Sequence, residues 1–192
     1  MRKILFTLPA ALALSACIEV DLSLEILDED TARMTGFMQM QRQFFDMSGG
    51  DGSFCSEEDG GTLTLTDTHA RCDFDQTGTY DEIMRPDGVD APSDDMQGSI
   101  THLGGNRTQV LLPLSTIAED LAGEDADPAM MAMMRQMLAG MSISLSVTGA
   151  RIESSSGVIS EDGTRATVTL DVDSYFAPAA EAPGDFDTIV EF

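Results

Sequence analysis

The chain has 192 residues, of which 34 are acidic and 10 are basic, so its formal net charge at pH 7 is −24. This length suits one domain with its own core. The excess of negative charge repels phosphate backbones and anionic lipid headgroups, and we therefore expect neither nucleic-acid binding nor electrostatic docking on a membrane.

The first residues of the chain have the organisation of an export signal. Arg2 and Lys3 form a basic start, and the apolar run Ile4 to Leu14 follows them. A transmembrane helix needs about 20 apolar residues, whereas this run is shorter and contains Pro9. We therefore expect residues 1–16 to be a signal peptide that is removed after export.

The segment Leu14-Ser15-Ala16-Cys17 resembles the lipobox of bacterial lipoproteins. The resemblance implies that Cys17 is acylated and becomes the first residue of the mature chain, so that residues 17–192 form a single lipid-anchored domain whose partner is the membrane. In many such lipoproteins an aspartate after the cysteine favours the inner membrane. Ile18 stands there in this chain, which favours the outer membrane, facing the periplasm. An ordinary secretory signal is the alternative.

Two further cysteines, Cys55 and Cys72, remain in the mature chain. An even pair in an oxidising compartment predicts a disulfide. On the chain-entropy model, a bridge over a loop of this length stabilises the fold by about 3 kcal/mol. A redox-active dithiol is the alternative, and it is disfavoured because the sequence contains no C-x-x-C motif.

Alternating apolar residues predict strands through most of the mature chain. Ile18 to Ile26 alternates without a break and returns as Thr31 to Met40 after the turn Asp28-Glu29-Asp30. The further predicted elements are a short helix over Gln41 to Met47, hairpins of residues 62–66 with 69–75 and of 99–103 with 108–112, strands over 141–147 and 166–173, and an edge strand over 188–192. The sequence thus predicts an α+β fold, in which a mostly antiparallel sheet built from hairpins is packed by a few short helices.

A helix with a methionine stripe is predicted between Asp127, its N-cap, and Gly140. Its apolar side consists of Met130, Met131, Met133, Met134, Met137 and Leu138. The stripe either packs on the sheet as core or lines a groove for apolar ligands, because unbranched thioethers adapt to irregular surfaces. If the stripe lines a groove, the candidate ligand-binding residues are Met130, Met134 and Met137.

Several motifs of the mature chain resemble the LppM-type lipoprotein domain. They are Cys17-Ile18-Glu19-Val20-Asp21, Ser146-Val147-Thr148-Gly149, Ser156-Gly157 and Glu161-Asp162-Gly163-Thr164. This resemblance implies a mixed sheet packed by helices and a role in the cell envelope that includes binding of lipid or glycolipid.

The sequence favours binding over catalysis. It has two histidines and no tryptophan, and it lacks the G-x-S-x-G, H-E-x-x-H and P-loop motifs, so we expect no enzymatic activity and no cofactor. Asp73 to Asp81 has the spacing of a calcium loop, but Met84 stands where the bidentate glutamate is needed. The leading hypothesis is a lipid-anchored periplasmic protein that binds an apolar, lipid-like ligand or an envelope partner protein. The alternatives are a structural or assembly-assisting envelope lipoprotein without a small-molecule site, and an exported protein that binds calcium, or copper through methionines with His69 and His102.

Overall fold

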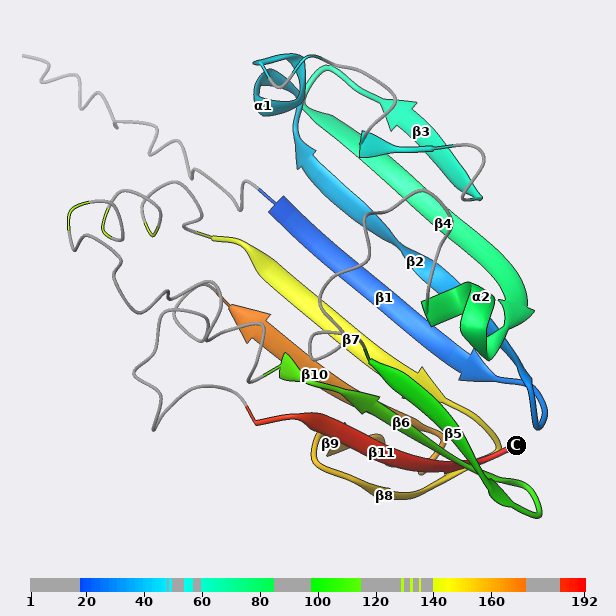
Figure 1. The fold of residues 1–192 in the computed structure, drawn as a ribbon. Coiled ribbons are helices and arrows are strands. Elements are labelled where there is room, and N and C mark those ends of the chain that lie inside the picture. The colour runs from blue at the N-terminus through cyan, green and yellow to red at the C-terminus, as the bar shows by residue number, and fades with distance from the viewer. Residues whose placement is uncertain are drawn as a thin grey trace, which may run out of the picture.

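The structure is a computed structural model (Figure 1), and it describes residues 18–47, 49, 54–56, 60–84, 98–114, 129, 132, 135, 140–171 and 184–192. In these ranges the chain is mostly β: strands form two sheets, and the helices α1 and α2 are short. In chain order the elements are β1 (Ile18–Ile26), β2 (Thr31–Gln41), α1 (Arg42–Met47), β3 (Gly61–Leu65), β4 (His69–Thr79), α2 (Tyr80–Met84), β5 (Ser99–Gly104), β6 (Arg107–Leu112), β7 (Ser142–Thr148), β8 (Arg151–Ser155), β9 (Val158–Ile159), β10 (Arg165–Asp171) and β11 (Phe186–Glu191).

The first sheet has seven strands in the order β3-β4-β2-β1-β7-β10-β9. The predicted hairpin β1–β2 is confirmed, with Ile18 opposite Met40 and Ile26 opposite Ala32. The predicted hairpin β3–β4 is confirmed as well. The pairing of β1 with β7 is parallel, so the sheet is mixed, although its other pairings are antiparallel.

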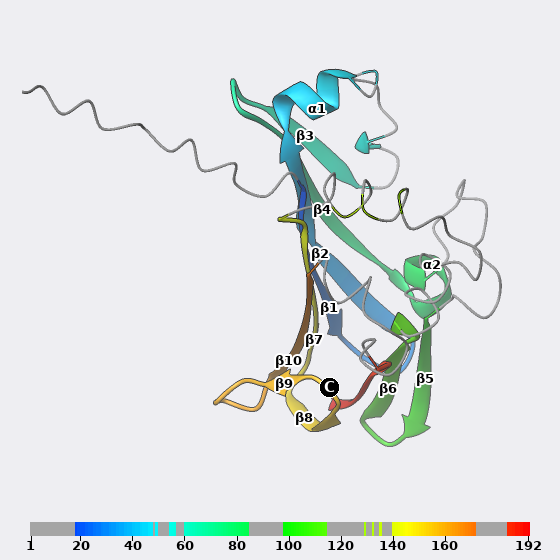
Figure 2. The ribbon, with the colours of Figure 1, turned by 90° about the vertical axis from the view of Figure 1, so that its left-hand side faces the viewer.

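The second sheet has four strands in the order β5-β6-β11-β8. The predicted hairpin β5–β6 is confirmed, and its turn contains Gly104 and Gly105 with φ of 95° and 70°, values that glycine adopts without steric cost. Figure 2 shows the first sheet nearly edge on, with the second sheet against one of its faces near the end where β1 finishes.

The core lies where the two sheets face each other. From the first sheet it includes Ile26, Ala32, Val147, Ala166 and Leu170, and from the second sheet Val110, Ile152, Phe186 and Val190. Alternation explains this arrangement, because every second residue of a strand points to the same face. Polar residues that alternate with them, such as Glu25 and Asp187, are exposed, whereas Thr108 and Thr188 lie on the inner face of the second sheet and are buried.

Two predictions about the architecture are wrong. The sequence predicted an α+β fold with helices packed on one sheet, but within the described residues a second sheet covers the first, and the fold is β-rich. The segment at the C-terminus is not an edge strand, because β11 lies between β6 and β8 and pairs with both. Alternation predicted most of the strands but not β8 and β9, and it does not specify which strands pair.

Cys17 and the predicted ligand-binding residues Met130, Met134 and Met137 lie outside the described residues. Of the methionine helix, the structure describes Ala129, Ala132 and Arg135, which are helical and exposed, as expected for the side opposite the stripe. Within the described part of the chain, no helix is long and apolar enough to span a membrane.

Candidate functional site: an apolar pocket between the sheets

An apolar pocket of about 280 Å³ opens on the inner face of the first sheet. One wall is formed by side chains of β1, β2 and β7, among them Leu22, Met34 and Leu145. The opposite wall is formed by Ile83 and Met84 of α2 and by the segment Leu112-Pro113-Leu114, which continues β6. The pocket therefore lies between the layers, at the border of the core.

The strand register explains the first wall. Leu22 lies opposite Leu145, and Leu24 lies opposite both Met34 and Val147, so these side chains share a face across three neighbouring strands. Gly36 lies opposite Leu22 on β2 and adds no side chain to this row. A β-carbon at Gly36 would collide with the backbone carbonyl oxygen of Asp21, so the two strands approach closely there.

The pocket has a buried floor and a more open mouth. Ile83, Leu114 and Val147 are at most 5% exposed and belong to the core, whereas Leu22 and Leu145 are half-buried. A preformed apolar surface that water reaches at one end is the usual form of a small-molecule site.

The described lining of the pocket carries no charged side chain. Among the described lining residues only Ser146 has a polar side chain, and because Ser146 alternates with Leu145 and Val147 on β7, this side chain points to the opposite face. Its hydroxyl donates to the carbonyl oxygen of Leu22 at 3.4 Å and accepts from Nη1 of Arg165 at 3.0 Å. Such walls can bind an uncharged apolar group by excluding water, and they provide neither a general base nor a nucleophile.

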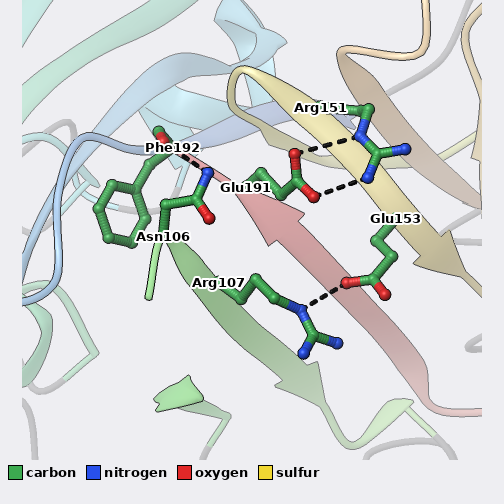
Figure 3. Close-up of polar contacts among 6 residues, drawn as sticks. All are labelled: Asn106, Arg107, Arg151, Glu153, Glu191 and Phe192. Carbon is green, nitrogen blue, oxygen red and sulfur yellow. Dashed lines mark hydrogen bonds and ion pairs between the residues drawn. The ribbon is translucent and has the colours of Figure 1, made fainter. Parts of the chain in front are cut away.

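The charged clusters of the described chain lie elsewhere. On the outer face of the second sheet, Arg151 makes a bidentate contact with Glu191 at 2.7 and 3.1 Å, and Arg107 contacts Glu153 at 2.6 Å (Figure 3). The hydrogen bonds from Arg151 lower the pKa of Glu191. Because each carboxylate is held by an arginine, this cluster joins β6, β8 and β11 rather than serving a reactant.

No metal centre is found among the described residues, since they contain no group of three or more histidine, cysteine, aspartate or glutamate side chains placed to hold an ion. The calcium-like segment from Asp73 runs along β4 into α2. Two of its carboxylates pair with arginines instead, Asp73 with Arg71 and Asp75 with Arg33.

The predicted disulfide is confirmed: the structure joins Cys55 to Cys72. A β-carbon added at Gly61 would lie 3.0 Å from each of the two sulfur atoms, so the start of β3 packs directly on the bridge. The bridge lies outside the described lining of the pocket.

Sequence reasoning found part of the pocket and missed the rest. Alternation predicted that Leu22, Met34 and Leu145 each lie on the apolar face of their own strand, but it did not predict that β7 pairs with β1 and brings the three together. No local pattern identified the contribution of Ile83 and Met84, because α2 was not predicted. Met34 and Met84 line the pocket, whereas Met130, Met134 and Met137 lie outside the described residues.

No protein-family model matches the chain, and no curated protein matches it significantly. Among solved structures, the chain is similar to the folded domain of LppM from Mycobacterium tuberculosis, determined by NMR, with 12% sequence identity, a TM-score of 0.48, and coverage of 95% of this chain and 94% of that one. The resemblance to the LppM-type domain is thereby confirmed. This similarity concerns the course of the chain and gives no information about a ligand.

Proposed function

We propose that this chain is a lipid-anchored exported protein that binds an apolar, lipid-like ligand in the pocket between its two sheets. The observation that carries the proposal is a pocket of about 280 Å³ without a charged side chain in its described lining. The export signal and the lipobox support acylation at Cys17, and Ile18 supports the outer membrane, facing the periplasm. The proposal is a binding function without catalysis.

The size of the pocket favours a ligand that inserts one apolar end. An apolar cavity of about 150 Å³ takes up benzene, so a cavity of about 280 Å³ accommodates the end of an acyl chain but not a whole lipid. Each buried methylene contributes about 0.8 kcal/mol, so four of them contribute about 3 kcal/mol. A polar headgroup would stay outside the mouth, in water.

Native mass spectrometry of the protein after gentle extraction from membranes tests the proposal. We expect a bound lipid on the wild-type protein and its loss in the Leu145→Phe variant, because the larger ring fills the pocket. Ile143→Phe is the matched control, because Ile143 lies on the same face of β7 but does not line the pocket. Both substitutions add volume near the core at a cost of about 1–3 kcal/mol.

A wild-type protein without bound lipid, or equal lipid occupancy in both variants, would contradict the proposal. Either result would favour the alternative function, a structural envelope lipoprotein without a small-molecule site.

A further inference from the structure

We infer that the end of the first sheet formed by α1 and β3 contacts the lipid bilayer and that, together with the anchor at Cys17, it fixes the orientation of the domain on the membrane. The inference rests on the acylation of Cys17 in the proposed function. The contact surface consists of Phe44, Met47, Leu63 and Leu65, and we call it the anchor-end patch.

The start of β1 places this end of the sheet at the membrane. Ile18 already pairs with Met40, so no flexible residue separates Cys17 from the sheet. A residue of extended chain spans about 3.5 Å. An acylated Cys17 therefore holds the start of β1 at the bilayer surface, and the body of the domain cannot move away on a tether.

The strand register continues this end of the sheet toward the patch. Ile18 lies opposite Met40, Met40 opposite Ala70, and Ala70 opposite Leu65. These three interstrand steps of about 4.8 Å each place Leu65 about 14 Å from the anchored strand. Helix α1 follows β2 directly, and Figure 1 shows α1 and the start of β1 at the same end of the sheet.

The side chains of the anchor-end patch are apolar and exposed. Met47 is 77% exposed, Leu65 45%, and Phe44 and Leu63 each 39%. The described arginines next to them are paired, Arg42 with Asp46 at 2.8 Å and Arg71 with Asp73 at 2.8 Å. Paired charges weaken the preference of this surface for water, and exposed apolar side chains gain free energy by entering the interfacial region of a bilayer.

The opposite end of the sheet has the character of a surface that faces water. The turn between β1 and β2 contains Asp28, Glu29 and Asp30. At about 3.3 Å per residue, β1 carries this turn about 27 Å away from its first residue. The anchor, the patch and the acidic turn thus define one orientation, with α1 and β3 toward the lipid.

Site-directed fluorescence on the full-length acylated protein in phosphatidylcholine vesicles tests the inference. The environment-sensitive dye NBD is attached to Met47→Cys in one variant and to Val158→Cys in the other. Val158 is also 77% exposed, but it lies on β9, beside the part of β10 that pairs with the far end of β7. With Cys17 acylated and Cys55 bonded to Cys72, the introduced cysteine is the one that reacts.

We expect a blue shift of the emission and quenching by spin-labelled lipid for the dye at position 47, and neither for the dye at position 158. The baseline is the same pair of variants carrying Cys17→Ser, in which both dyes should emit as in water. Solvent-like emission from position 47 in protein that floats with the vesicles would overturn the inference while leaving the anchor intact. Protein that lacks acyl chains by mass and does not float would overturn both. Absence of a lipid from the pocket by native mass spectrometry, with the dye at position 47 still blue-shifted, would contradict the proposed ligand but support the proposed orientation.

Discussion

The phenol oxygen of Tyr80 lies 3.2 Å from the hydroxyl oxygen of Thr108, and this contact links α2 to β6 of the second sheet. The proton of Tyr80 is donated to the carbonyl oxygen of Asp28 at 2.6 Å, in the turn between β1 and β2. Thr108 is therefore the donor to Tyr80. Tyr80 thus links the β1–β2 turn of the first sheet to β6 of the second sheet. Thr108 is fully buried, so its hydrogen bond is shielded from water.

Removal of the Tyr80 hydroxyl should weaken the joint between the layers. We expect Tyr80→Phe to lower the free energy of unfolding by about 1–2 kcal/mol, because a buried hydroxyl loses its partner. Urea denaturation of Tyr80→Phe, Thr108→Val and the double variant measures this. The double variant should be more stable than the sum of the two single losses predicts, whereas strict additivity would show that the contact contributes nothing.

Gly36 should not tolerate a side chain. Its φ is 152°, and an added β-carbon would collide with the backbone carbonyl oxygen of Asp21, which cannot move without breaking the sheet. We expect Gly36→Ala to destabilise the fold by about 3 kcal/mol or more. Gly78→Ala on β4 is the control, because the nearest atoms there belong to the side chain of Glu82. Equal melting temperatures of the two variants would refute this account of β2.

The disulfide should contribute to stability without affecting ligand binding. Cys55 and Cys72 are 17 residues apart, and a loop of that size corresponds to about 3 kcal/mol on the chain-entropy model. We expect the Cys55→Ser, Cys72→Ser double variant to have a free energy of unfolding lower by this amount, measured by urea denaturation. It should retain the lipid seen by native mass spectrometry. Loss of the lipid in a still-folded double variant would show that the bridge supports the pocket.

Acid should destabilise the fold in a narrow pH range. The hydrogen bonds from Arg33 lower the pKa of Asp75, and those from Arg151 lower the pKa of Glu191. In the unfolded chain these carboxyls titrate near their usual value of about 4. As the pH falls below about 4, the unfolded state binds more protons than the folded state, and stability decreases until the folded pKa is passed.

Stability measured against pH checks this contribution. Glu191→Gln and Arg151→Gln should each give a shallower slope below pH of about 4, because the first removes the carboxyl whose pKa is lowered and the second removes the main cause of the lowering. A slope unchanged from wild type in both variants would contradict the assignment.

The local part of the fold could be predicted from the sequence. The alternation of Ile18 to Ile26 and the glycines 104 and 105 gave the hairpins and their inner faces, because these signals depend on neighbouring residues. The parallel pairing of β1 with β7 and the insertion of β11 between β6 and β8 join segments far apart in sequence, and alternation contains no information about them. For the same reason, Leu22 and Met34 could be predicted on the apolar faces of the first hairpin, while the pocket itself and the contribution of Leu114 to it could not.

The central claim, an apolar ligand between the sheets, is tested most directly by NMR of ¹³C-methyl methionines. The sample is the Cys17→Ser protein, and the probe is lysophosphatidylcholine below its micelle concentration. We predict saturable shifts of the Met34 and Met84 methyl signals, which line the pocket, and no shift of Met47, which lies in the anchor-end patch. Signals of Met130, Met134 and Met137 in the same spectrum test the hypothesis that the methionine stripe lines a ligand-binding groove. Unchanged Met34 and Met84 signals at the highest probe concentration would contradict the claim.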